Sequence, residues 1–133
     1  MTTLCNIQIT AAQTGVVQTA VTGLGTPTSV TLEAIFTYVA SAATTVDAWV
    51  QTSIDAGVTW YDVANFHYTT ASAVQYQNVS NTAINTSTAL TSLTLSSSTS
   101  INGFLGDRLR VVDTTVGTYG AGTQLTINAY PRY

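Results

Sequence analysis

Apolar and polar side chains alternate along much of the chain with a period of two residues. The clearest example is "SVTLEAIFTYVA", residues 29–40, which follows the turn-forming stretch "GLGTPTS". Its apolar positions are Val30, Leu32, Ala34, Phe36 and Tyr38, and its polar positions are Thr31, Glu33 and Thr37. This alternation is typical of a strand with one buried and one solvated face. We therefore predict a strand whose apolar set points into the core.

Two more alternating stretches, residues 45–54 and 59–68, flank a short turn and predict a β-hairpin. The apolar face comprises Val46, Ala48, Val50 and Ile54 in the first arm, and Trp60, Ala64, Phe66 and Tyr68 in the second. Trp49 and Tyr61 fall on the opposite face, so both faces of the hairpin carry aromatic rings. A surface strand should have one wet face, so we expect a second contact surface here. The alternative is a register slip of one residue, which would exchange the faces.

The same patterns predict further strands. They cover residues 16–22, 73–80, 89–95, 107–114 and 123–130, with a short strand possible at 5–10. The glycines of "GTYGAG", residues 117–122, predict a hairpin between the last two strands. Altogether about eight short strands, with no helical pattern between them, indicate an all-β fold built as an antiparallel β-sandwich or barrel.

A length of 133 residues fits one domain, 1–133, with a core large enough to need no disulfide. The single cysteine, Cys5, is interpreted as a small apolar core residue. Residues 80–103 are rich in Ser, Thr, Asn and Ala and form a predicted loop region. Two interpretations stay open there: a strand flanked by loops, or an extended arm that becomes ordered against a partner.

Charged residues make up only 7% of the chain, lysine is absent, and threonine occurs 27 times. A net charge of -3 gives weak repulsion between molecules, so self-association is poorly opposed. Three arginines, Arg108, Arg110 and Arg132, are too few for a phosphate-binding patch, so no nucleic acid is expected as a partner. No apolar run approaches the roughly 18 residues of a membrane span, and no secretion signal is visible, so no membrane partner is expected either.

The stretch "SIDAGVTW", residues 53–60, matches the Asp-box pattern of sialidase propellers, which need several blades and a much longer chain. We predict a structural turn formed by Asp55, Gly57, Thr59 and Trp60. Asp55 would accept backbone hydrogen bonds, Gly57 would adopt a positive φ, and Trp60 would fold back as an apolar clamp. A calcium ion held by Asp55 is the alternative.

Catalytic chemistry finds little support in the sequence. The acidic residues are Glu33, Asp47, Asp55, Asp62, Asp107 and Asp113. Asp47 and Asp62 lie on the two hairpin arms and could approach each other, but like charges directly opposite are destabilising. His67 is the only histidine and is interpreted as a packing or interface residue. We expect no catalytic residue, no cofactor and no metal, and therefore no enzyme.

Read together, "VDAWVQTSIDAGVTWYDVANFHYTTAS" (46–72) and "GFLGDRLRVVDTTVGTYGAGTQLTINAYPR" (103–132) resemble small structural proteins of tailed bacteriophages. The shared pattern is a strand, a "QTS-x-D-x-G-x-TW" turn, a second strand, "LGDR-x-R-V" and a closing glycine-rich hairpin. The resemblance implies a capsid decoration or cement protein with a jelly-roll or immunoglobulin-like sandwich. It carries over no catalytic residue.

Such a protein would bind the major capsid protein on the outside of the virion after synthesis in the host cytoplasm, as a homo-oligomer, either dimer or trimer. Residues 1–14 and the tail "AYPRY" are candidate arms, with Pro131 ending strand pairing. Candidate interface residues are Trp49, Tyr61, His67, Tyr130, Arg132 and Tyr133. The alternatives are a head–tail or tail component and a carbohydrate-binding module that uses Trp49, Trp60 and Tyr61.

Overall fold

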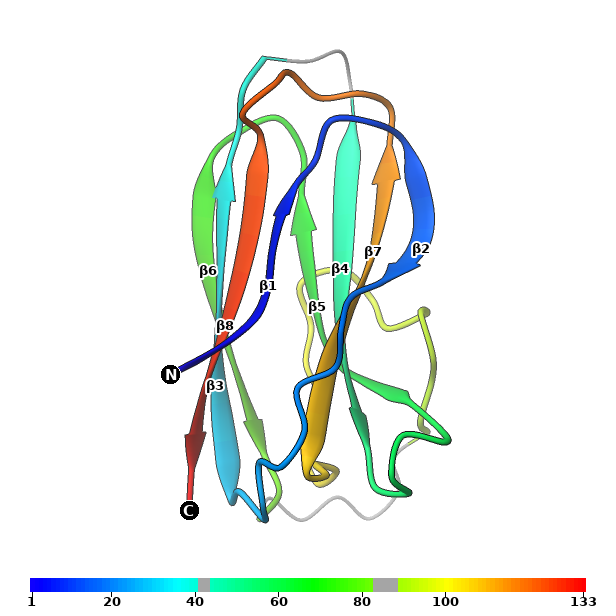
Figure 1. The fold of residues 1–133 in the computed structure, drawn as a ribbon, viewed down its shortest axis with the longest axis vertical. Coiled ribbons are helices and arrows are strands. Elements are labelled where there is room, and N and C mark those ends of the chain that lie inside the picture. The colour runs from blue at the N-terminus through cyan, green and yellow to red at the C-terminus, as the bar shows by residue number, and fades with distance from the viewer. Residues whose placement is uncertain (41–43, 83–88) are drawn as a thin grey trace.

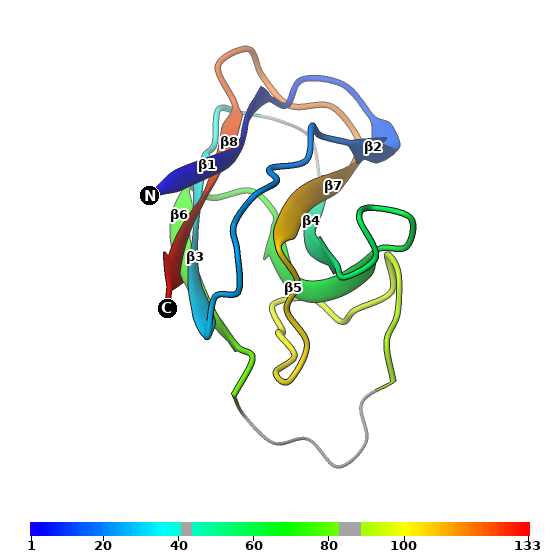
Figure 2. The ribbon, with the colours of Figure 1, turned by 60° about the horizontal axis from the view of Figure 1, so that its bottom comes forward.

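The computed structural model describes residues 1–40, 44–82 and 89–133, and these ranges form eight strands and no helix. The strands are β1 (Thr2–Gln8), β2 (Gln13–Val17), β3 (Ser29–Thr37), β4 (Thr45–Ser53), β5 (Tyr61–Tyr68), β6 (Ala73–Ser80), β7 (Arg108–Val116) and β8 (Gln124–Arg132). Sheet A has the order β1-β8-β3-β6 and sheet B the order β2-β7-β4-β5, all antiparallel. Figures 1 and 2 show them as two packed layers. The predicted all-β sandwich is confirmed.

The strand pairs are nested within one another. Strand β1 pairs with β8, β2 with β7, β3 with β6, and β4 with β5. The chain therefore folds as one long hairpin of paired strands that is rolled into two sheets, which is the topology of a jelly roll. An immunoglobulin-like sandwich divides its strands differently between the sheets. Of the two expected sandwich types, the strand order is that of the jelly roll.

The core lies between the two sheets and follows the predicted alternation. Strand β3 buries Val30, Leu32, Ala34 and Phe36, and β4 buries Val46, Ala48 and Val50. The ring of Phe36 stacks on Tyr68 of β5 at a centroid distance of 4.7 Å. The inward faces of β3 and β4 are thus confirmed, except that Ile54 lies exposed in the turn after β4.

Two predicted strands differ from the structure. The strand expected at 16–22 begins at Gln13 and ends at Val17, and Val21 keeps only an isolated bridge to Leu109 of β7. The strand expected at 89–95 is absent, since these residues follow an irregular path. Their Ser and Thr side chains compete for backbone groups, which favours irregular structure over a ladder.

The glycine-rich stretch 117–122 is not a hairpin. Strand β7 pairs with β2 and β4 in sheet B, whereas β8 pairs with β1 and β3 in sheet A. Residues 117–122 therefore cross from one sheet to the other. Tyr119 is buried in the core, and a Cβ on Gly120 would lie 2.7 Å from the Ala40 carbonyl oxygen. Glycines mark a reversal of the chain, but they do not decide whether the joined strands share a sheet.

Neither expected arm is free of the sandwich. Residues 2–8 form β1, and Leu4, Cys5 and Ile9 are buried in the core. Strand β8 continues through Pro131, which lies opposite Val30, because β1 no longer flanks β8 at that point. A proline is tolerated where one edge of the strand has no partner to receive its N–H.

Candidate functional site

The turn at 53–60 is held by hydrogen bonds from its own side chains. Oδ1 of Asp55 accepts from the Ser53 hydroxyl and the Thr59 amide, both at 2.8 Å, and Oδ2 accepts from the Thr59 hydroxyl. These bonds, the one from the Thr59 hydroxyl most of all, lower the pKa of Asp55 to about 2. Both carboxylate oxygens of Asp55 thus accept hydrogen bonds from within the turn.

Gly57 and Trp60 complete the turn. Gly57 has a φ of 88°, in the region that favours glycine, and its carbonyl accepts a hydrogen bond of 2.9 Å from the Trp60 indole. The guanidinium of Arg110 in β7 lies 4.4 Å from the centre of the Trp60 ring, a cation–π distance. The structure thus brings Asp55, Gly57, Thr59 and Trp60 together in one turn that rests on β7.

The stretch "LGDRLR", residues 105–110, packs directly against this turn. A Cβ on Gly106 would lie 1.9 Å from the Ser53 carbonyl oxygen, so only glycine fits there. Arg108 lies beside Gly57 and forms an ion pair of 3.0 Å with Asp107. The two motifs that carry the bacteriophage resemblance are distant in sequence, yet they meet at the lower end of the sandwich in Figure 1.

The lower end also exposes apolar side chains. Val58 is 80% exposed, Ile54 65% and Tyr133 74%. Beside the turn lies an open pocket of about 240 Å³, lined by Gly25, Thr26, Ile54, Asn81, Leu105, Gly106 and Asp107. We call Ile54, Val58, Tyr133 and this pocket the lower-end surface. It combines exposed apolar groups with a turn that is rigidly hydrogen-bonded.

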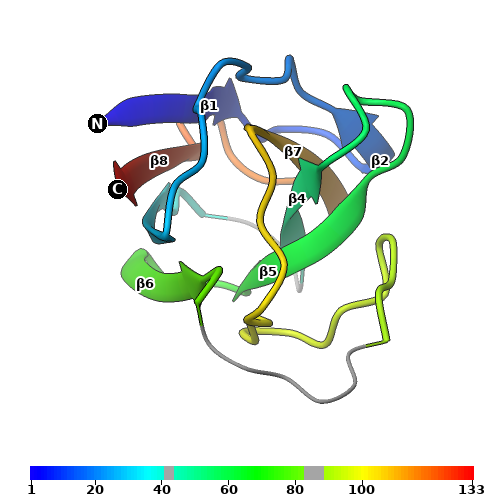
Figure 3. The same ribbon diagram turned by 90° about the horizontal axis from the view of Figure 1, so that it is seen from below.

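Residues 89–103, here called the covering segment, run along the free edge of β5 on the side away from β4 (Figure 3). The backbone of β5 bonds to this segment from Asp62 N to Thr91 O and from Asn65 N to Thr99 O, each at 2.8 Å, and Val63 O accepts from Ile101 N. The segment therefore occupies an edge that would otherwise offer unpaired backbone groups to other chains.

The buried carboxylate of Asp62 anchors the covering segment. Its oxygens accept hydrogen bonds from the amides of Leu93, Thr94 and Leu95 at 2.9–3.1 Å. The side-chain Nε2 of Gln51 also donates to Asp62 at 2.9 Å. The side-chain Oε1 of Gln51 accepts from Nε of Arg110 at 2.9 Å. A continuous polar network thus links the Trp60 ring, through Arg110 and Gln51, to the covering segment.

A β-bulge places Asp62 in this position. Val50 lies opposite Ala64, whereas Gln51 lies opposite Asp62, so Val63 is the extra residue on β5. The bulge reverses the alternation and turns Asp62 to the outer face of sheet B. The sequence patterns do not single out Gln51, and they point to Asp62 only as a possible partner of Asp47 in an acid pair. The available signal was a carboxylate on the apolar face predicted for residues 60–68.

The same bulge changes the aromatic face of the hairpin. Tyr61 lies opposite Thr52, on the inner side of sheet B, and packs edge-on against Phe104 at 5.7 Å, so its predicted outward position is wrong. Trp49 does point outward, but its indole N–H donates to the Leu95 carbonyl of the covering segment at 3.1 Å. Trp49, Trp60 and Tyr61 therefore contact three different parts of their own chain and form no common stacking platform.

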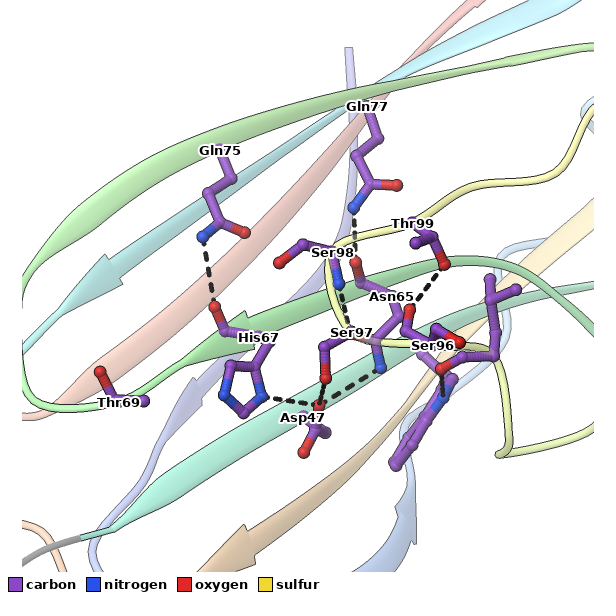
Figure 4. A network of polar contacts seen from close by, with 12 residues as sticks. Asp47, Asn65, His67, Thr69, Gln75, Gln77, Ser96, Ser97, Ser98 and Thr99 are labelled. Carbon is purple, nitrogen blue, oxygen red and sulfur yellow. Dashed lines mark hydrogen bonds and ion pairs between the residues drawn. The ribbon is translucent and has the colours of Figure 1, made fainter.

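His67 belongs to a polar cluster on the same face, drawn in Figure 4. Its Nδ1 lies 2.9 Å from Oδ1 of Asp47, directly across the strand pair, and Asn65 and Ser97 also approach this oxygen. Asp47 faces His67 and Asp62 faces Gln51, so the two acids that could have met across the hairpin stand apart. The Nδ1 atom of His67 therefore has its partner within the chain.

The gap between the edge strands β5 and β6 is bridged by two glutamines, also visible in Figure 4. Gln75 and Gln77 of β6 donate from their Nε2 atoms to the carbonyls of His67 and Asn65 on β5. The Oε1 atoms of both glutamines are buried without a hydrogen-bond partner. Buried acceptors of this kind are commonly satisfied by ordered water.

The remaining candidate interface residues lie at or near the end of β8. Tyr130 donates to Glu33 Oε1 at 3.3 Å, and the Tyr133 hydroxyl donates to the Leu24 carbonyl at 2.6 Å. Arg132 is exposed, and within the described ranges its guanidinium forms no ion pair. These residues occupy two surfaces, since Tyr130 belongs to the outer face of sheet A and Tyr133 to the lower-end surface.

Metal and thiol chemistry can be described only for the ranges that the structure covers. Within 1–40, 44–82 and 89–133, no three His, Cys, Asp or Glu side chains are grouped closely enough to hold a metal ion. Burial raises the pKa of the Cys5 thiol to about 12, so the thiolate is not formed at neutral pH. No helical segment in these ranges has the length and hydropathy of a membrane span.

Comparisons with known proteins identified no relative of this chain. Protein-family models gave no match, and neither curated proteins nor solved structures gave a significant one.

Proposed function

We propose that this protein is a non-enzymatic structural component of a bacteriophage particle, a decoration or cement protein that binds the capsid lattice. The observation that carries the proposal is the meeting of the two resemblance motifs at the lower-end surface. There the Asp55 turn rests on residues 105–110 and presents Val58 and Ile54 to solvent. A rigid surface with exposed apolar groups loses little conformational entropy on docking.

The mechanism is stabilisation by linkage. A protein that binds the assembled shell, and not its separated subunits, lowers the free energy of the assembled state. The partner is the major capsid protein, and the site of action is the exterior of the virion. A dimer or trimer would add avidity, because several weak contacts on a repeating lattice act together. The low density of charge on the chain opposes such association only weakly.

The experiment is co-sedimentation of the full chain with empty capsids assembled from the major capsid protein of the same phage. We expect binding at a fixed stoichiometry and a higher capsid disruption temperature. Val58→Asp should abolish co-sedimentation, since it places a charge in the docking surface. Val74→Asp, on the outer face of sheet A, is the matched control and should bind normally.

Absence of the wild-type chain from the capsid pellet would overturn the proposal. Sedimentation with purified tails in place of capsids would assign the protein to the head–tail or tail structure instead. The carbohydrate-binding alternative based on Trp49, Trp60 and Tyr61 loses its platform, because these rings contact different parts of the chain.

A further inference from the structure

The outer faces of the two sheets differ in how they are covered. On sheet B, the covering segment bonds to outward-facing side chains such as Trp49, Gln51 and Asp62. On sheet A, the outward side chains hydrogen-bond to one another across the strands, and no described segment lies over them (Figure 3). Tyr76 on this face is 61% exposed and Val74 53%.

A row of linked side chains crosses all the strands of sheet A. Tyr76, Glu33, Asn128 and Thr3 are cross-strand neighbours on β6, β3, β8 and β1. The Tyr76 hydroxyl donates to Glu33 Oε2 at 2.7 Å, and the Asn128 amide donates to Glu33 Oε1 at 3.1 Å. The Thr3 hydroxyl continues the row by donating to Asn128 Oδ1 at 3.0 Å. We call these residues the glutamate row.

The adjacent row extends the same chemistry. Thr31 donates to Asn78 Oδ1 at 2.8 Å, and the Tyr130 hydroxyl reaches Glu33 Oε1 from this row at 3.3 Å. The hydrogen bonds to Glu33, the one from Tyr76 above all, lower the pKa of its carboxyl, so it is ionised at neutral pH. Both tyrosine hydroxyls are held by one carboxylate, which orients the rings before any ligand arrives.

The side chains on the outer face of sheet A favour some classes of ligand over others. Glu33 is the only charged residue in the two rows, so an anionic ligand bound there would meet a carboxylate, and Arg132 lies one row further along the same face, opposite Ser29. A stable protein interface buries about 1,200 Å² or more around an apolar centre. Among the described residues of strands β1, β3, β6 and β8, Val74 and Tyr76 are the only exposed large apolar side chains, which is too few for such a centre.

A neutral saccharide has the properties that the face requires. Its hydroxyls can donate to the remaining lone pairs of Glu33 and of the asparagine oxygens, and they can accept from amide and hydroxyl donors. The C–H face of a pyranose can pack on the exposed Tyr76 ring, whose π-face is negative. Since the tyrosine rings are already oriented, binding would cost less side-chain entropy.

We propose that the outer face of sheet A is a binding site for neutral oligosaccharides, with Tyr76 as the stacking ring and Glu33, Asn128 and Asn78 as hydrogen-bonding groups. This site is separate from the lower-end surface and does not depend on capsid binding. It would give a particle-borne protein a contact with glycans on a cell surface.

The test is NMR titration of the isotopically labelled full chain with maltohexaose, cellohexaose and mannohexaose, and with sialyllactose and a heparin oligosaccharide as charged probes. At least one neutral hexasaccharide should shift the amide resonances of residues 31–33, 76–78 and 128–130. Tyr76→Ala should weaken that binding about tenfold, through loss of the stacking surface. Tyr76→Phe, which keeps the ring, should retain much of it.

Val58→Ala, at the lower end, is the control and should bind as the wild type does. Melting curves of both Tyr76 variants would show whether they fold. No shift with any neutral probe would overturn the proposal, as would binding restricted to the charged probes or an unchanged affinity in a folded Tyr76→Ala. Shifts on this face that depend on protein concentration alone would assign it to a second copy of the chain instead.

Discussion

Two carboxylates hold irregular segments in this molecule, and they differ in their exposure to water. Asp55 lies at the surface and closes the turn at 53–60 with donors from Ser53 and Thr59. Asp62 is fully buried and receives three consecutive backbone amides. An exposed carboxylate can exchange its partners for water, whereas a buried one cannot. The two residues should therefore respond differently to substitution.

Asp55→Ala should lower the melting temperature at pH 7, because the Thr59 and Ser53 donors lose their acceptor. The pKa of Asp55 is depressed from 3.8 to about 2, so its contribution is present above about pH 4 and is lost as the pH falls towards 2. The difference in melting temperature between variant and wild type should shrink over that interval. Calorimetry from pH 2 to pH 7 measures it.

Val58→Ala, in the same turn but with an exposed side chain, is the control and should melt like the wild type. A difference between Asp55→Ala and the wild type that stayed constant from pH 7 to pH 2 would contradict the role given to the ionised carboxylate.

At the scale of elements, the covering segment replaces a strand that the alternation predicted at 89–95. It lies along the edge of β5 without forming a ladder, because side chains such as Asp62 and Asn65 bind its amides. The second interpretation of residues 80–103, an arm awaiting a partner, is also not what the described part shows. Its residues 89–103 are ordered against β5, while 83–88 lie outside the described residues.

Asp62→Ala should destabilise the fold by about 3 kcal/mol, because three amides lose their acceptor in a buried position. Hydrogen exchange at Leu93, Thr94 and Leu95 should accelerate more than exchange in β3, since the segment loosens before the sandwich opens. Chemical denaturation and hydrogen-exchange NMR measure the two effects.

Ser97→Ala is the matched control, since the Ser97 hydroxyl reaches Asp47 only at 3.5 Å. If Asp62→Ala kept wild-type exchange at residues 93–95, the anchoring role of the carboxylate would be excluded.

At the scale of the whole molecule, the jelly roll joins the two ends of the chain. Strand β1 pairs with β8, which lies between β1 and β3 in sheet A. Pairing the first strand with the last closes a loop that spans almost the whole chain, so this pairing carries the largest loop-closure entropy of the strand pairs. The N-terminal residues are thus part of the core, which their interpretation as an arm did not foresee.

A chain beginning at Thr10 should fail to fold cooperatively. It loses Leu4, Cys5 and Ile9 from the core and exposes the edge of β8. Circular dichroism should show no sharp melting transition, and the shortened chain should aggregate. Removal of Met1 alone, which is exposed, is the control. A truncated chain with a wild-type melting transition would contradict this prediction and would show that residues 1–9 act as a free arm.

The strands with one buried face, such as β3 and β4, and with them the all-β class, follow from the amino-acid sequence alone. The alternation of apolar and polar residues indicates which face of a strand is buried, and this pattern can be recognised within a few neighbouring residues. The sequence also locates the Asp55 turn, whose hydrogen bonds close within a few residues. Three features become visible only in the folded chain: which strands share a sheet, the bulge at Val63 that turns Asp62 outward, and the burial of β1. Sheet membership and the burial of β1 depend on pairings between residues far apart in the chain, and the bulge depends on the register of the β4–β5 pairing, where a shift of one residue reverses every side chain beyond it.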